Sequence, residues 1–103
     1  MNVLYLVLYT RQGCCLCEGL QDRLSNIPLD QLKPSLELLI LDIDGSDVSD
    51  EIRLRFQNEV PVLLLRSKNN EYSRELPRVS PRLQEQSLFN WLQQTIFKTI
   101  NLS

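Results

Sequence analysis

Short apolar runs mark the strands that this sequence predicts. The run Val3–Tyr9 places leucine, valine and tyrosine at successive positions, as expected for a strand with both faces buried in a sheet. The runs Leu36–Asp42 and Val60–Leu65 predict two more strands, the last of which opens with a proline. A polar segment, Glu71–Leu76, follows a turn at Lys68–Asn70 and predicts a short strand at an edge of the sheet.

Three helices are predicted between and after these strands. Leucines recur at helical spacing across about Cys15–Ser25, and Pro28 disfavours helix beyond that segment. A short second helix can be capped by Ser49 or Asp47 and ends at Phe56. The third covers about 84–99, and its buried stripe consists of Leu88, Leu92, Ile96 and Ile100, widened by Phe89.

The elements follow one another in the order β-α-β-α-β-β-α. Because a helix separates the first two strands, we expect these strands to pair in parallel, whereas the short turn before the last strand predicts an antiparallel hairpin. The predicted fold is therefore of the α/β class, with a central mixed four-stranded sheet flanked by helices. A chain of 103 residues is long enough for one core, so residues 1–103 are predicted to form a single domain.

Composition narrows the classes of function. The chain is 43% hydrophobic and 23% charged, with a formal net charge of −2, which is ordinary for a folded soluble protein. Its lysines and arginines are scattered, so neither nucleic acid nor a membrane surface is indicated as a partner. The apolar start lacks the basic region of a signal peptide and is shorter than the roughly 20 residues of a spanning helix. We therefore expect a cytoplasmic protein. We also expect it to act as a monomer.

Three cysteines lie within four residues, shortly after the first predicted strand. Cys14 and Cys17 have C-x-x-C spacing, and Cys15 stands between them. Such a cluster has no distant partner for a structural disulfide, and in a reducing compartment it is more often catalytic or metal-binding. The sequence contains no histidine, which excludes Cys/His zinc sites and histidine-activated nucleophiles. Three sulfurs this close cannot complete a tetrahedral metal site, so we expect thiol chemistry and no metal.

The cysteines stand where a buried strand passes into the first turn of a helix. A short polar loop with Gly13 makes this connection. The first backbone N–H groups of a helix have no internal partner, and the aligned peptide dipoles put partial positive charge there. Both effects stabilise a thiolate, so the pKa of a cysteine at this position can fall from about 8.5 to roughly 3.5–7.5. The rest of the chain is predicted to hold this turn in place.

The sequence has a second motif, Val60-Pro61, at the start of the third predicted strand. Together with the C-x-x-C after the first strand and the order of elements, it resembles the thioredoxin superfamily, and within it the glutaredoxins. The motif of small glutaredoxin-like domain proteins is matched by residues 13–18, Gly-Cys-Cys-Leu-Cys-Glu. The resemblance covers nearly the whole chain and implies a thioredoxin-like (glutaredoxin-like) fold.

The resemblance implies roles for individual residues. It makes Cys14 the nucleophile and Cys17 the resolving thiol of a disulfide exchange. It also implies that Pro61 follows Val60 in a cis peptide bond, and that Val60, Pro61 and Arg11 belong to a substrate groove beside the cysteines. Arg11 matches the position of a basic residue that helps to hold the glutathione carboxylate in glutaredoxins.

The departures from the glutaredoxin pattern concern glutathione. Cys15-Leu16 replaces the proline and aromatic residue that are usual between the cysteines, and Glu59 stands where threonine is usual. The Gly-Gly turn and aspartate that hold glutathione are missing, and residues 76–81 read Leu-Pro-Arg-Val-Ser-Pro. A proline has no N–H to donate. We therefore expect no cofactor, with glutathione bound weakly or not at all.

Two classes of function are consistent with these residues. In the first, the protein is a thiol–disulfide oxidoreductase: Cys14 attacks a protein or small-molecule disulfide, Cys17 resolves the mixed disulfide, and Cys15 is dispensable. In the second, it is a non-catalytic binding module that presents the strand edge at Val60 to a protein, and the cysteines are inert buried residues. A related alternative is a dimer that bridges an iron–sulfur cluster through Cys14 and a thiol cofactor. The sequence leaves the substrate and the reductant open.

Overall fold

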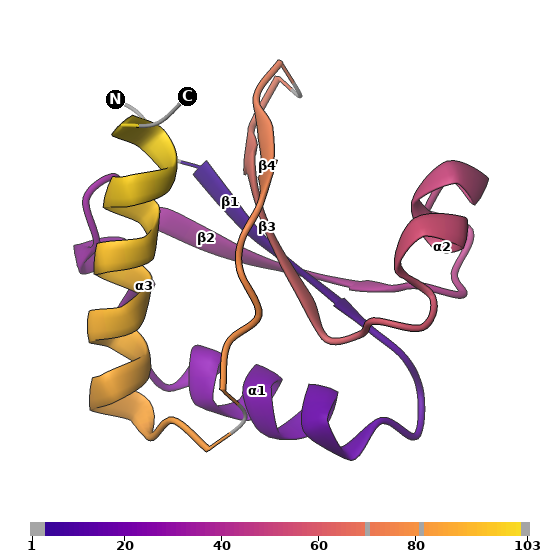
Figure 1. Cartoon of the computed structure of the whole chain (residues 1–103), viewed down its shortest axis with the longest axis horizontal. Helices are drawn as coiled ribbons and strands as arrows, with labels where there is room; N and C mark the ends of the chain where they lie inside the picture. Colours follow the sequence, from indigo (N-terminus) through magenta and orange to yellow (C-terminus); the bar gives the residue numbers. More distant parts are fainter. Residues whose placement is uncertain (1–3, 70, 81, 102–103) are drawn as a thin grey trace.

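The fold is built on a mixed four-stranded sheet (Figure 1). The computed structural model describes residues 4–69, 71–80 and 82–101. In chain order its elements are β1 (Leu4–Thr10), α1 (Cys15–Ser25), the 3₁₀ helix η1 (Leu29–Gln31), β2 (Leu36–Asp42), α2 (Asp50–Phe56), β3 (Val62–Ser67), β4 (Ser73–Glu75) and α3 (Glu85–Asn101). This is the order that the sequence predicts, with one added 3₁₀ turn.

The strands lie side by side in the order β2-β1-β3-β4. β1 pairs with β2 in parallel, from Leu4 opposite Leu36 to Thr10 opposite Asp42, and pairs with β3 in the antiparallel direction. β4 is the antiparallel partner of β3. Helices α1 and α3 cover one face of the sheet and α2 covers the other (Figure 1). The predicted fold class is thus confirmed, an α/β fold of thioredoxin-like architecture.

Strand β1 is buried because it has a strand on each side and helices on both faces. Its side chains alternate between two cores: Leu6 and Leu8 point to the face with α1 and α3, and Val7 and Tyr9 to the face with α2. The larger core is completed by leucines and isoleucines of the two helices: Leu20, Leu24, Leu88, Leu92 and Ile96. The smaller core is closed by Ile43, Val48 and Phe56. The end of β1, where the cysteine loop starts, is therefore fixed from both sides.

Helix α3 follows the predicted stripe. Leu88, Leu92 and Ile96 are fully buried, and Ile100 packs half-buried at the end of the row. Phe89 widens the contact with the larger core. Among the described residues, even this 17-residue helix is not long and apolar enough to cross a membrane, and neither is any other.

Several predicted boundaries need correction. The third strand begins at Val62 and not at Val60, because Pro61 has no N–H to donate and the chain joins the sheet only where Val62 lies opposite Tyr9. The fourth strand is shorter than predicted, since only Ser73–Glu75 pairs with β3. The predicted positions at Val3, Asn70 and Pro81 lie outside the described residues.

Local signals place the second helix correctly. Ser49, one of the two predicted caps, accepts a hydrogen bond at its Oγ from the N–H of Ile52 at 3.3 Å. The helix then ends at Phe56, whose ring stacks on Tyr9 with 5.8 Å between the ring centroids. The short helix α2 therefore covers the smaller core, and Phe56 is the aromatic residue that it contributes.

We predict that Phe56→Ala lowers the free energy of unfolding by roughly 3–5 kcal/mol, because it opens a cavity in the smaller core. Leu54→Ala on the same helix is the matched control. The Leu54 side chain is 73% exposed, so this change is expected to stay within about 0.5 kcal/mol of the wild type. Urea unfolding followed by circular dichroism measures both values. Equal losses in the two variants would contradict the role given to Phe56.

Candidate active site

The loop between β1 and α1 is shaped by a glycine. Gly13 has a φ of +83°, in the left-handed region that residues with a Cβ rarely adopt. The N–H of Cys14 then bonds to the carbonyl of Arg11 at 3.1 Å, which closes a tight turn. Cys14 itself keeps extended backbone angles and is the N-cap of α1. The glycine turn thus places Cys14 directly at the N-terminus of α1.

Cys14 and Cys17 are joined by a disulfide whose Cα atoms lie 5.2 Å apart. The backbone N–H of Cys17 also donates a hydrogen bond to Cys14 Sγ at 3.1 Å, in the position of a helix cap. The two bonded cysteines differ in exposure: Cys17 is 1% exposed, whereas Cys14 is half-buried. An incoming thiol can therefore reach the pair at Cys14, while Cys17 is shielded beneath it.

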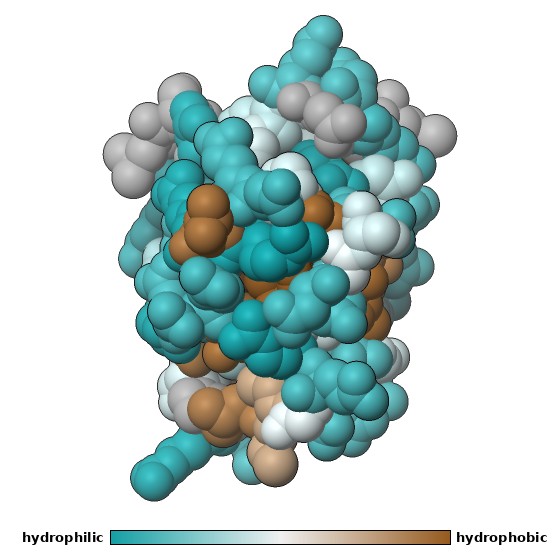
Figure 2. All heavy atoms as spheres, turned by 90° about the vertical axis from the view of Figure 1, so that its right-hand side faces the viewer, coloured by the Kyte–Doolittle hydropathy of each residue, from teal (hydrophilic) through white to brown (hydrophobic). Residues whose placement is uncertain are grey.

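Two exposed residues separate the bonded cysteines. Cys15 is a free, exposed thiol in the first turn of α1. Leu16 is 54% exposed, which is unusual for a large apolar side chain of a helix with a buried face. Figure 2 shows the face that carries α2. Hydrophobic side chains gather there at the lower end, where α1 begins in Figure 1.

The predicted cis peptide bond between Val60 and Pro61 is present, so that prediction is confirmed. Pro61 lines a small opening of about 70 Å³, together with Leu16, Leu20, Arg78 and Val79. The structure therefore brings Pro61 against the first turn of α1. Val60 lies elsewhere, since it packs against the smaller core under α2. A second cis bond, between Lys33 and Pro34, was not predicted.

Arg11 is engaged within the protein. Its Nε and Nη2 donate to the two carboxylate oxygens of Asp44 at 2.8 and 3.0 Å, and its Nη1 donates to the carbonyl of Gln57 at 2.7 Å. This fork joins the cysteine loop to the segments before and after α2. The hydrogen bond lowers the pKa of the Asp44 carboxyl and raises the pKa of Arg11. Arg11 borders a different opening from that of Pro61, one that Cys17 shares.

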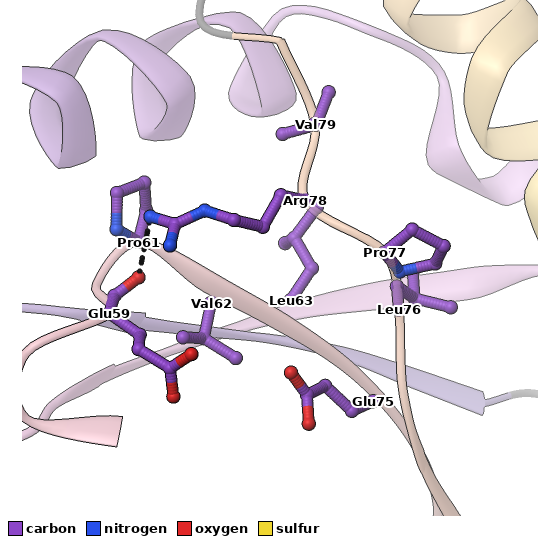
Figure 3. Close-up of a pocket in the computed structure, with 9 residues that line it drawn as sticks. All are labelled: Glu59, Pro61, Val62, Leu63, Glu75, Leu76, Pro77, Arg78 and Val79. Carbon is purple, nitrogen blue, oxygen red and sulfur yellow. Dashed lines mark hydrogen bonds between the residues drawn. The ribbon is translucent and has the colours of Figure 1, made fainter. Parts of the chain in front are cut away.

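Arg78 borders the Pro61 opening, although sequence reasoning gave it no role. It follows Pro77 in the connection from β4 to α3, and its Nη2 donates to the carbonyl of Glu59 at 3.1 Å (Figure 3). The spacing of residues along the chain does not indicate this contact. The sequence does place an arginine between two prolines in the segment where glutaredoxins have their glycine turn, and that departure could have marked Arg78 as a candidate.

The sheet order, the C-x-x-C disulfide and the cis proline together define a thioredoxin-like domain. The chain belongs to the glutaredoxin-like domain family (DUF836), whose family model matches residues 5–93. No curated protein sequence matches it significantly. It is similar to a solved chain titled "Structure of a malarial protein", with a TM-score of 0.59 and 14% identity over 91% of this chain and 98% of that one. At this identity the likeness shows the fold alone. The cysteine pair at disulfide distance in a glutaredoxin-like domain fits a redox role.

The Arg11–Asp44 pair predicts a stability that depends on pH. Because the pKa of Asp44 is lower in the folded than in the unfolded protein, its stabilisation is fully present above the ordinary value of 3.8 and is lost as pH falls through the lower folded value. We therefore expect Asp44→Asn to lower the urea midpoint at pH 6, and expect its difference from the wild type to shrink as the pH falls below 3.8.

Asp47→Asn serves as the control, because Asp47 is exposed in the same connection but lies outside this ion pair. Its urea midpoint should equal that of the wild type at pH 6. If Asp44→Asn leaves the midpoint unchanged at pH 6, the pair contributes nothing to folding.

Proposed function

We propose that this protein is a thiol–disulfide oxidoreductase in which Cys14 is the nucleophile and Cys17 the resolving thiol. The observation that carries the proposal is the placement of the pair. The half-buried Cys14 sulfur caps α1 and accepts the N–H of Cys17, and the Cys17 sulfur lies directly behind it. The burial of Cys17 supports this division of roles, because Cys14 is the more accessible cysteine of the bonded pair.

The helix start stabilises the reduced form of the nucleophile. Once the disulfide opens, the Cys14 thiolate keeps the Cys17 N–H as a donor and lies at the positive end of the helix dipole. Both interactions favour the charged sulfur over the neutral thiol. Arg11 adds little to this, since the negative charge of Asp44 lies directly against its guanidinium.

The cycle moves two electrons from the protein dithiol to a substrate disulfide. The Cys14 thiolate attacks one substrate sulfur, and the other substrate sulfur leaves as a thiolate and takes up a proton. Cys17 loses its proton and attacks Cys14 Sγ, which releases the second substrate thiolate and forms the internal disulfide. A thiol reductant then restores the dithiol by the reverse exchange at Cys14.

The remaining assignments complete the proposal. The substrate is a protein or small-molecule disulfide, and the protein works in the cytoplasm as a monomer without a cofactor or metal. The proposed groove includes Pro61 and Leu16, which meet at one opening. Cys15 stays outside the cycle, because the disulfide joins Cys14 to Cys17 and leaves Cys15 a free thiol.

We predict a distinct outcome for each Cys→Ser variant. Cys14→Ser should abolish disulfide reduction, since no other described residue places a sulfur at the cap of α1. Cys17→Ser should accumulate a mixed disulfide with the substrate, because the resolving thiol is gone. Cys15→Ser should keep wild-type turnover and a reduction potential of roughly −270 to −200 mV. Turnover with a model disulfide, alkylation rate against pH and intact mass measure these outcomes.

Several results would contradict the assignment of roles. Turnover by Cys14→Ser, or faster alkylation of Cys15 than of Cys14 near neutral pH, would show that the nucleophile is misassigned. A wild-type protein that binds partners but exchanges with no disulfide would favour the binding-module alternative. A brown protein with bound iron would favour the cluster-bridging dimer.

We also predict that glutathione binds weakly. Three donor groups of Arg11 are already used, and the N–H of Leu76 bonds to the carbonyl of Leu63 at 2.9 Å, with Pro77 next in the chain. Arg11 and the backbone at Leu76 and Pro77 therefore offer few donors to the glutathione carboxylates. Calorimetry with reduced and oxidised glutathione should detect no binding in the micromolar range, beside a glutaredoxin as positive control. A micromolar Kd would overturn this prediction.

A further inference from the structure

Arg78 supplies a positive charge to an otherwise apolar opening beside the cysteines. The opening has about 70 Å³, and its remaining lining residues are Leu16, Leu20, Pro61 and Val79. Leu16 connects it to the reactive turn, since this residue stands between the bonded cysteines in sequence and is 54% exposed. The opening therefore adjoins the turn of α1 that carries Cys14.

The guanidinium of Arg78 is held in place without being neutralised. Its Nη2 bonds to the main-chain carbonyl of Glu59, and Figure 3 shows the Glu59 carboxylate pointing away from it. Among the described residues, no carboxylate forms an ion pair with Arg78, whereas Arg11, Arg53 and Arg55 each have one. A charge fixed by a neutral acceptor remains available to an incoming anion.

We propose that Arg78 selects disulfide substrates that carry a carboxylate close to the reacting sulfur. This inference rests on the proposed function, because it names the substrate class of the same site. Because Arg78 is exposed, solvent and salt screen a contact between its guanidinium and a carboxylate, so the expected preference is small and depends on ionic strength. Glu75, which lines the adjoining opening, is already paired with Arg55 at 3.1 Å. The preference for a carboxylate would come from the positive charge of Arg78 itself and not from the charge of the whole protein, since the chain carries a net charge of −2.

A single-turnover experiment tests the proposal without any added reductant. The protein dithiol supplies both electrons: Cys14 and Cys17 become a disulfide, and a peptide disulfide becomes two thiols. The protein carries Cys15→Ser, so that one reactive pair remains. Three disulfide-linked peptide dimers are compared, identical except for Glu, Gln or Lys two residues from the cysteine. Acid quenching, alkylation and mass spectrometry give the rate of each reaction.

The Glu peptide is expected to react about three- to fivefold faster than the Gln peptide at low ionic strength, and the Lys peptide more slowly. Arg78→Gln should remove this difference, and Arg78→Glu should reverse it. Arg78→Lys keeps the charge and should keep the order. Arg82→Gln is the matched control: it removes an exposed arginine outside the opening and should preserve the preference.

Two negative outcomes are distinguishable. If the parent protein is oxidised by all three peptides at equal rates, or if Arg78→Gln keeps the parent's preference, the role of Arg78 is wrong and the proposed function stands. If the parent dithiol stays reduced with every peptide, the proposed function fails, and this inference fails with it. Circular dichroism of each variant shows that a lost preference does not come from a lost fold.

Discussion

The hydrogen bond from the Cys17 N–H to Cys14 Sγ is the interaction on which the proposed thiol chemistry depends. It exists because Cys14 occupies the cap of α1, where backbone donors have no partner within the helix. The cap is fixed in turn by β1, which lies in the middle of the sheet with a core on each face. A buried strand, a glycine turn and a helix start thus hold one sulfur accessible and its partner covered.

The second constraint comes from the antiparallel pairing of β1 with β3. Because Val62 lies opposite Tyr9, the residues just before β3 are brought to the end of the sheet from which the cysteine loop leaves. Pro61 therefore shares an opening with Leu16, although the two are far apart in sequence. The register of two buried strands consequently decides which residues lie beside the first turn of α1.

The sequence predicts best where the determinants are local. Apolar spacing and Pro28 gave the bounds of α1, and Ser49 gave the start of α2, because a cap and a helix stop depend on neighbouring residues. The start of the third strand was misplaced because the apolar Val60 looks like a strand residue but packs under α2. The contacts of Arg11 with Asp44 and of Arg78 with Glu59 join distant segments, so spacing along the chain could not show them.

The proposed role of Arg78 would replace one kind of anion recognition by another in the loop before α3. A glycine turn recognises an anion through backbone N–H groups, which requires positions free of side chains and of proline. Here Pro77 removes a donor, and the next residue contributes the guanidinium of Arg78 in place of main-chain groups. A side-chain cation reaches further and tolerates more varied geometry than a backbone cradle, but it fixes its ligand less closely. Under the proposed role of Arg78, such a site would suit carboxylates on diverse disulfide substrates better than the fixed shape of one small thiol.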